Sequence, residues 1–117
     1  KITINGGYQT RDFIYVTDIV NALVSAYNKI SNEQIGISLV SNVLTGTSIS
    51  IDELVLKIEE IFEKKSYKEY AELHISDPEV SSGSTITMGK LLNLKNLKIL
   101  DHGLKETINW FMINNAK

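Results

Sequence analysis

The chain has 117 residues, of which 43% are hydrophobic and 22% are charged, and its formal net charge is −2. This length suits one soluble globular domain and is too short for two ordinary ones. The nearly balanced charge excludes the basic surface with which proteins bind nucleic acids or anionic membranes. No apolar run approaches the roughly 20 residues of a membrane span. The sequence has no cysteine, which excludes disulfides and thiolate metal sites and fits a cytoplasmic protein.

The first thirty residues predict two strands and a helix. Residues 1–4 alternate polar and apolar side chains as a strand does, and the glycine pair within residues 5–7 supplies a turn. Residues 11–16 are aromatic and β-branched, which favours a second strand. Thr17 or Asp18 then offers an N-cap oxygen to a helix whose apolar stripe consists of Ile19, Leu23, Ala26, Tyr27 and Ile30.

The middle of the chain contains its clearest helix signal. Residues 35–43 are strand-like, and residues 45–48 are typical of a turn. Ser50 and Glu53 form a capping box, because the serine hydroxyl can accept the N–H of Glu53 while the glutamate carboxylate reaches back. The predicted helix carries an apolar stripe made of Ile51, Leu54, Val55, Ile58, Ile61 and Phe62.

The last part of the chain predicts one strand, a loop and two helices. Residues 70–75 alternate as a strand does, residues 77–85 have the composition of a mobile loop, and residues 86–94 favour a short helix. A final helix begins near Asp101, with core-facing residues Leu104, Ile108, Trp110, Phe111 and Met112. With about three to four helices among short strands, we expect a compact α/β lobe, small and α+β-like, with a self-sufficient core.

Single residues carry only weak chemical signals. The guanidinium of Arg11 could grip an anion through two parallel hydrogen bonds, or it could form a surface ion pair with Asp12. His74 comes three residues before Asp77, and both a structural and a binding role remain open for it. The acidic residues form no paired acid–base arrangement, and three are expected on a solvated helix face: Glu59, Glu60 and Glu63.

A longer string is far more specific. From Gly7 to Val20 the sequence reads Gly-Tyr-Gln-Thr-Arg-Asp-Phe-Ile-Tyr-Val-Thr-Asp-Ile-Val. This closely resembles the segment G-x-Q-x-R-D-F-[IV]-[YH]-V-x-D-[IVL]-[VA] of the NAD-dependent epimerase/dehydratase family. That family comprises extended short-chain dehydrogenase/reductases that act on nucleotide sugars, and the segment opens the last part of its chains.

Three further stretches agree with that family, in the same order. Residues 42–51 resemble its N-V-x-x-G-x-x-x-S-[IV] stretch, and residues 100–111 resemble its closing L-x-x-G-L-x-x-T-[IV]-x-W-[YF] helix. Asp77 and Pro78 resemble the end of its R-x-G-D-[PV] loop, with His74 in place of the arginine and Ser76 in place of the glycine. The resemblance covers essentially all 117 residues.

The resemblance implies roles for four residues. Arg11 would clamp the diphosphate of a UDP- or dTDP-sugar, and Phe13 would face the nucleotide. Asp77 would reach the ribose, and His74 would approach the phosphates, although an imidazole cannot form the guanidinium fork. Asp18 also matches the family motif, but we expect it to act only as a helix cap.

The chain lacks the residues with which this family uses NAD. It has no G-x-G-x-x-G loop, and none of its five tyrosines is followed by lysine four positions later, so the Tyr-x-x-x-Lys pair is absent. The resemblance therefore implies one substrate-binding carboxyl-terminal domain over residues 1–117. Its NAD-binding Rossmann domain would be absent from this chain, through excision or natural truncation, and the chain would be inert on its own.

An alternative is a stand-alone, non-catalytic binding or interaction module built on the same fold. In either case we expect no cofactor or metal in this chain itself, and NAD in the parent enzyme. A lobe without its Rossmann domain would expose the apolar surface that normally faces that domain. We therefore expect the isolated chain to self-associate.

Overall fold

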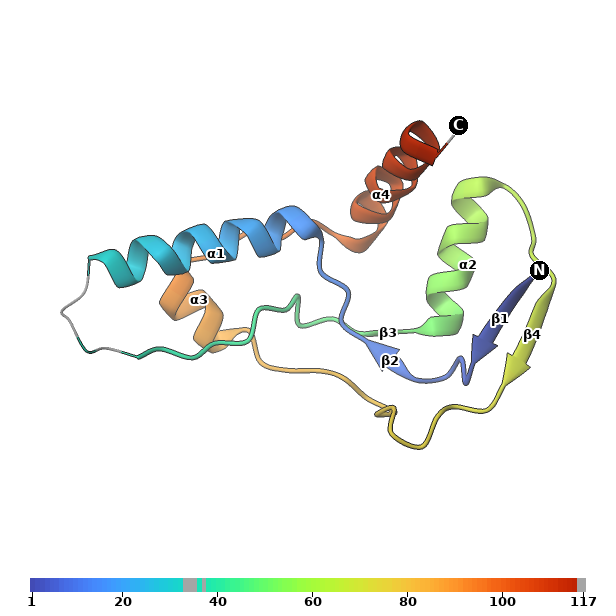
Figure 1. Ribbon diagram of the computed structural model, residues 1–117, viewed down its shortest axis with the longest axis horizontal. Coiled ribbons are helices and arrows are strands. Elements are labelled where there is room, and N and C mark those ends of the chain that lie inside the picture. The colour runs from blue at the N-terminus through green and yellow to red at the C-terminus, as the bar shows by residue number, and fades with distance from the viewer. Residues whose placement is uncertain (33–35, 37, 116–117) are drawn as a thin grey trace.

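The computed structural model describes residues 1–32, 36 and 38–115, which form four helices and four short strands (Figure 1). The helices are α1 (Val16–Ser31), α2 (Ile51–Phe62), α3 (Ile86–Leu92) and α4 (Leu100–Asn115). The strands are β1 (Ile2–Asn5), β2 (Thr10–Arg11), β3 (Ile49–Ser50) and β4 (Lys68–Ala71). This mixture confirms the predicted α/β class. Within the described part of the chain, no helix combines the length and apolar character that crossing a membrane requires.

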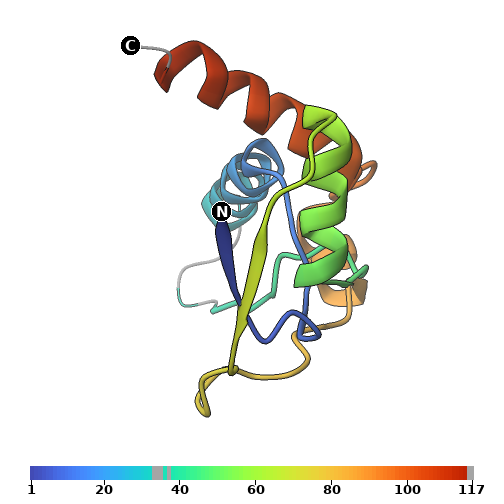
Figure 2. The ribbon, with the colours of Figure 1, turned by 90° about the vertical axis from the view of Figure 1, so that its right-hand side faces the viewer.

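The helices are grouped in two pairs along an elongated body (Figures 1 and 2). Helix α1 packs against α3, and α2 lies against α4, where Lys57 of α2 and Asp101 of α4 form an ion pair at 2.7 Å. Beyond α2, strands β1 and β4 pair in parallel, with Ile2 opposite Lys68. The connection over residues 72–85 then runs along the lower edge of Figure 1, back from β4 to α3.

Helix α2 begins at the predicted capping box. The Ser50 hydroxyl accepts the N–H of Glu53 at 3.1 Å, and the Glu53 carboxylate accepts the N–H of Ser50 at 2.8 Å. These hydrogen bonds to Ser50 lower the pKa of Glu53. The helix ends where Glu63 adopts a left-handed conformation, with φ of 52°. Both ends of α2 are therefore fixed by local interactions, which explains why the sequence signal was clear.

Helix α1 begins earlier than predicted and uses neither predicted cap. Tyr15 occupies the N-cap position with an extended backbone and no side-chain cap bond. The prediction that Thr17 or Asp18 caps this helix was therefore wrong. Asp18 lies in the first helical turn, where its buried carboxylate accepts the backbone N–H of Lys98 at 2.9 Å. The Asp18 carboxylate thus binds Lys98, 80 residues away in sequence, and does not cap its own helix.

Three predicted strands are shorter than expected or absent. The strand predicted over 11–16 is reduced to β2, because β3 offers only two residues for it to pair with. In place of the strand predicted over 70–75, the structure has β4, which begins two residues earlier and ends at Ala71. No strand forms over residues 38–43 of the predicted strand 35–43, whose residues 35 and 37 lie outside the described part. In each case the local sequence favours a strand, but a strand also needs a neighbouring strand to pair with.

The molecule is elongated rather than compact. Its radius of gyration is 17.5 Å and its principal extents are 55 × 36 × 23 Å, whereas a compact chain of this length has a radius of about 13 Å. The accessible surface is 8830 Å², about 2,400 Å² more than the roughly 6,400 Å² expected for a compact monomer of this mass. The prediction of a compact lobe was therefore wrong.

The core is correspondingly small. Among the described residues, the buried apolar side chains are Ile4, Ala22, Leu44 and Met88. Trp110 and Phe111 were predicted to pack in the core, but they are 58% and 54% exposed. Their rings contact each other edge to face, with centroids 5.2 Å apart. Helix α4 contacts α2 near its start and projects away from the body, as Figure 2 shows, so its later turns meet little of the chain.

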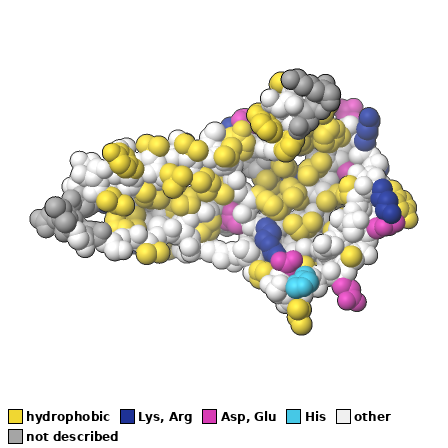
Figure 3. Space-filling view, in the orientation of Figure 1, with side chains coloured by type: hydrophobic (Ala, Val, Ile, Leu, Met, Phe, Trp, Pro, Cys, Tyr) yellow, Lys and Arg dark blue, Asp and Glu magenta, His cyan; other side chains and the backbone are white. Residues whose placement is uncertain are grey.

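Helix α1 is apolar on two sides. Ala22 is buried on the side that faces α3. Along the helix, a second set of large apolar side chains is exposed, which we call the α1 stripe: Val16, Val20, Leu23, Val24, Tyr27 and Ile30. Figure 3 shows hydrophobic side chains over α1 and in the hollow between α1 and α2. A helix that is apolar on most of its surface is normally covered on most of its surface.

Glu59 is buried, contrary to the prediction of a solvated helix face for it, whereas Glu60 and Glu63 are exposed as predicted. The two carboxylate oxygens of Glu59 accept hydrogen bonds from the N–H of Ser66 at 2.7 Å and from the Lys68 ammonium at 2.9 Å. These bonds, the one from Ser66 above all, hold the pKa of Glu59 below its ordinary value of 4.5. Glu59 thus joins α2 to the start of β4.

Glu59→Gln should reduce the acid sensitivity of the fold. Because the folded-state pKa is lowered, the carboxylate stabilises the fold above its unfolded-state value of 4.5 and loses that effect as pH falls through the folded-state value. The variant should therefore be less stable than wild type at about pH 7, and this difference should shrink towards about pH 3. Urea unfolding at both pH values measures it, with Glu60→Gln as the exposed control on the same helix. If wild type and Glu59→Gln differed in stability by the same amount at both pH values, the lowered pKa of Glu59 would be contradicted.

Candidate functional site

Strand β2 lies between two segments that are distant from it in sequence. Its Thr10 is paired with Ser50 of β3 in antiparallel register. On the other side, the N–H of Thr10 donates to the carbonyl of Glu79 at 2.8 Å, and the N–H of Ser81 donates to the carbonyl of Thr10 at 3.1 Å. The segment with the Arg-Asp-Phe motif is therefore joined directly to the loop that follows the Asp-Pro motif.

Arg11 is the only arginine in the sequence, and it is half-buried. Its Nη1 donates to the carbonyls of Thr10 and Pro78, both at 2.8 Å. It forms no ion pair with Asp12 in the described part of the chain, so the alternative of a surface pair was wrong. Its Nε and Nη2 make no hydrogen bond to any described residue. One part of the guanidinium is thus used by the backbone, and the other part is available to an anion.

Asp12 holds the turn that follows the Asn-Val motif. Its Oδ1 accepts hydrogen bonds from the N–H and the hydroxyl of Thr45, at 2.9 and 2.7 Å, and its Oδ2 accepts the N–H of Gly46 at 2.7 Å. Gly46 has φ of +81°, a conformation that favours glycine. Sequence reasoning missed this role of Asp12. The signal was a carboxylate beside a Thr-Gly turn whose N–H groups need an acceptor.

Phe13 contributes to a cavity of about 450 Å³ between the 45–49 segment, α3 and the start of α4. The wall consists of three threonines, Thr45, Thr47 and Thr85, the polar residues Asn96 and Lys98, and a set of apolar residues: Phe13, Ile49, Met88, Leu94, Leu97, Ile99 and Leu100. This volume is in the range of small-molecule pockets, about 300–1,000 Å³. Arg11 does not line this cavity.

His74 lies beyond β4 in an exposed turn, and not in a strand as predicted. The N–H of Ser76 donates to His74 Nδ1 at 3.3 Å, and the Ser76 hydroxyl lies 2.7 Å from the same nitrogen. A ring nitrogen that accepts an N–H carries no proton, so this contact assigns the imidazole proton to Nε2. The Nε2–H group makes no hydrogen bond to a described residue.

Asp77 closes the same turn and is exposed. Its N–H donates to the carbonyl of His74 at 2.8 Å, and its carboxylate makes no hydrogen bond within the described residues. The next residue, Pro78, provides the carbonyl that Arg11 binds. The structure therefore brings Arg11, His74 and Asp77 to one loop, while Phe13 faces a neighbouring cavity.

The turn before β2 is fixed by Gln9, a residue whose role the sequence did not reveal. Its buried amide accepts the N–H of Gly7 and donates to the carbonyl of Asn5, both at 2.6 Å. Gly7 has φ of +104°, and a Cβ at this position would lie 2.7 Å from the Asp52 carboxylate. Both the positive φ and the close Asp52 carboxylate therefore require glycine at position 7. The hydrogen bonds of Gln9 fix the turn that leads into β2.

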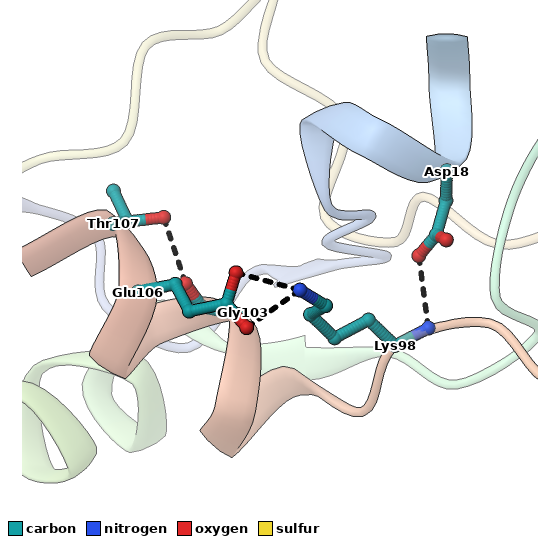
Figure 4. A network of polar contacts seen from close by, with 5 residues as sticks. All are labelled: Asp18, Lys98, Gly103, Glu106 and Thr107. Carbon is teal, nitrogen blue, oxygen red and sulfur yellow. Dashed lines mark hydrogen bonds and ion pairs between the residues drawn. The ribbon is translucent and has the colours of Figure 1, made fainter. Parts of the chain in front are cut away.

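Lys98 joins the start of α1 to α4, as Figure 4 shows. Its backbone N–H donates to Asp18, and its ammonium lies 2.6 Å from each carboxylate oxygen of Glu106. The ammonium also lies 4.1 Å from the ring centroid of Tyr15. Hydrogen bonding to Lys98 lowers the pKa of Glu106, and hydrogen bonding to Glu106 raises the pKa of Tyr15. These contacts stabilise one wall of the cavity that Phe13 lines.

The arrangement provides side chains that can bind a ligand. Arg11 and the Nε2–H of His74 can donate to anionic oxygens, and the Asp77 carboxylate can accept hydroxyl groups. In the part of the chain that the structure describes, no group of three or more His, Cys, Asp or Glu side chains is placed to hold a metal ion. These groups can recognise a ligand with negative charge and hydroxyls.

Comparison with curated proteins points to one class of enzyme. The chain is 31% identical over 104 residues to the UDP-glucuronate 4-epimerase of Thermodesulfobacterium geofontis, which covers 89% of the chain and 31% of that enzyme. It is also 31% identical over 108 residues to a UDP-glucose 4-epimerase of Cyamopsis tetragonoloba, which covers 92% of the chain and 31% of that enzyme. The chain thus spans about a third of these relatives. No protein-family model matches it.

Solved structures agree with these relatives. The UDP-glucose 4-epimerase of Thermotoga maritima, solved with UDP-glucose, matches 98% of the chain with a TM-score of 0.84 and 25% identity, over 36% of its own chain. MoeE5, solved with UDP-glucose and NAD, matches 97% of the chain with a TM-score of 0.86 and 26% identity, over 37% of its own chain. These matches confirm the resemblance that the four motifs indicated.

Asp12→Asn should loosen the turn at residues 45 and 46. The amide keeps one oxygen for Thr45, but its NH₂ group would face the N–H of Gly46 and cannot accept it. The free energy of unfolding should fall by about 1–3 kcal/mol, measured by urea unfolding. Asp101→Asn is the control, because Asp101 belongs to a partly exposed ion pair, and a change below about 1 kcal/mol is expected for it. Equal effects of the two substitutions would contradict the role of Asp12.

Proposed function

We propose that this chain, which corresponds to the carboxyl-terminal part of the NAD-dependent epimerase/dehydratase family, is the domain that binds the nucleotide sugar. Its ligand would be a UDP- or dTDP-sugar, and residues 1–117 would form one substrate-binding unit. The observation that carries the proposal is that Nε and Nη2 of Arg11 bind no described residue, while its Nη1 contacts the loop that carries His74 and Asp77.

Arg11 is suited to a diphosphate for two reasons. It keeps its charge at every physiological pH, and its Nε and Nη2 can donate two parallel hydrogen bonds to adjacent oxygens. It is also half-buried and fixed by two carbonyls, so little side-chain freedom remains to be lost when a ligand binds. Eleven lysines are spread over the rest of the sequence, but none can offer the same planar fork.

The loop of residues 74–77 would complete the contact with the nucleotide. The Asp77 carboxylate has no partner among the described residues and can accept the two ribose hydroxyls. His74 can give one hydrogen bond to a phosphate oxygen through Nε2, where relatives with an arginine could give two. We therefore expect Arg11 to carry most of the phosphate affinity of this domain.

Phe13 would place the base. The wall of the cavity that it lines combines apolar residues with threonines and an asparagine, which suits a planar, hydrogen-bonding ring. Because Phe13 follows Arg11 by two residues in an extended segment, a single ligand could reach both. The domain would thereby orient the sugar for a reaction performed elsewhere in the enzyme.

NAD would be held by a different domain. The residues of this chain do not fit the cofactor: the parallel sheet formed by the described residues has two strands, β1 and β4, and the sequence has no glycine-rich NAD loop. The hydride chemistry of the family is supplied by that cofactor. We propose that a Rossmann domain provides it and covers the α1 stripe, whose apolar side chains are 51–72% exposed in the described chain.

Arg11→Ala should weaken the binding of UDP-sugars to the full-length protein about tenfold to a hundredfold, because a hydrogen bond to a charged group contributes about 1.5–3 kcal/mol. Isothermal calorimetry with UDP-glucose and with dTDP-glucose measures the effect and the choice of base. Lys90→Ala is the matched control, since it removes one positive charge from an exposed position on α3. If Arg11→Ala binds as tightly as the control, Arg11 is not the phosphate clamp.

The 117-residue chain on its own should self-associate through the α1 stripe. Val20 and Val24 are about half exposed there, so Val20→Glu and Val24→Glu should shift sedimentation or light scattering towards the monomer at high protein concentration. The control is Ile75→Glu, because Ile75 is 99% exposed and lies outside the stripe. A wild-type chain that remains monomeric at high concentration, or a response to Ile75→Glu equal to that of the stripe variants, would contradict this surface.

A further inference from the structure

The loop of residues 74–81 touches the rest of the protein at few points. Most of its side chains are exposed, and that of Ile75 is 99% exposed. The loop is joined to β2 by the two backbone hydrogen bonds of Thr10, to Glu79 and Ser81. A third connection comes from Ser48, whose hydroxyl donates to the carbonyl of Ser81 at 3.0 Å.

The remaining connection is the guanidinium of Arg11. Nη1 carries two hydrogens, and both are used, one by the carbonyl of Thr10 and one by the carbonyl of Pro78. The bond to Pro78 spans 67 positions of the sequence. It is the only side chain to backbone bond from β2 to this loop among the described residues, and it falls directly after Asp77.

We propose that Arg11 is also a positioning residue, which latches the 74–81 loop to β2 through Nη1 while Nε and Nη2 face the ligand. The guanidinium is planar and rigid, so fixing one part of it fixes the other. A diphosphate bound at Nε and Nη2 would therefore hold Nη1 against Pro78 and order the loop that presents His74 and Asp77. The latch itself is present without ligand, and only this coupling rests on the proposed function.

Lysine cannot replace arginine in this double role. An ammonium group is a single point with three donors, and it can sit at the Pro78 carbonyl or at the phosphate, but it cannot bridge both with a fixed spacing. Arg11→Lys should therefore keep the positive charge and lose the coupling, which separates positioning from simple electrostatic attraction.

The first experiment measures amide hydrogen exchange, resolved by residue, in the full-length protein without ligand. In Arg11→Ala, the amides of Thr10 and Ser81 should exchange about five- to tenfold faster than in wild type, as expected for the loss of one hydrogen bond. The amide of Gly6, which donates to Ala71 between β1 and β4, should not change and controls for general unfolding. Thr10 and Ser81 exchange rates within twofold of wild type in Arg11→Ala would overturn the latch.

The second experiment repeats the measurement with saturating UDP, and with uridine as the control that lacks phosphates. UDP should slow hydrogen exchange at the Ser81 amide in wild type but not in Arg11→Lys. Uridine should slow this exchange in neither protein. If UDP binds wild type without slowing Ser81, the coupling is overturned. If UDP does not bind at all, the proposed function fails. The first experiment, which needs no ligand, still shows whether Arg11 latches the loop to β2.

Discussion

Two residues of β2 and the aspartate that follows them hold together parts of the chain that are far apart in sequence. Thr10 pairs on one side with β3 and on the other with the loop after β4. The side chain of Arg11 supports that loop, and the side chain of Asp12 supports the 45–46 turn. These bonds join Arg11 to the loop that carries His74 and Asp77, so this part of the site depends on the 10–12 segment.

Hydrogen bonds join these segments because the apolar core is small. Four apolar side chains are buried in the described part of the chain, and the α1 stripe is exposed. Polar connections replace part of the missing core: Lys98 links α1 to α4, and Glu59 links α2 to β4. Such connections fix geometry but contribute little net stability where water reaches them. The exposed α1 stripe is the surface that the proposed Rossmann domain would cover.

Features that depend on neighbours in sequence could be predicted from the sequence. The capping box of Ser50 and Glu53 is an example, because both partners lie within one helical turn. Features that depend on distant partners could not. The carboxylate of Asp18 looked like a local cap and instead binds Lys98, and Asp12 binds a turn 33 residues later. Likewise, Trp110 has a core-like sequence environment, but its partner surface is not formed by the described residues.

The central claim is that the guanidinium of Arg11 divides its donors between the protein and the ligand. A crystal structure of the full-length protein with a bound UDP-sugar tests this most directly. The account predicts diphosphate oxygens within hydrogen-bonding distance of Nε and Nη2, with Nη1 still bound to the carbonyl of Pro78. A diphosphate held by other residues, or an Arg11 side chain that leaves Pro78 when the ligand is present, would contradict it.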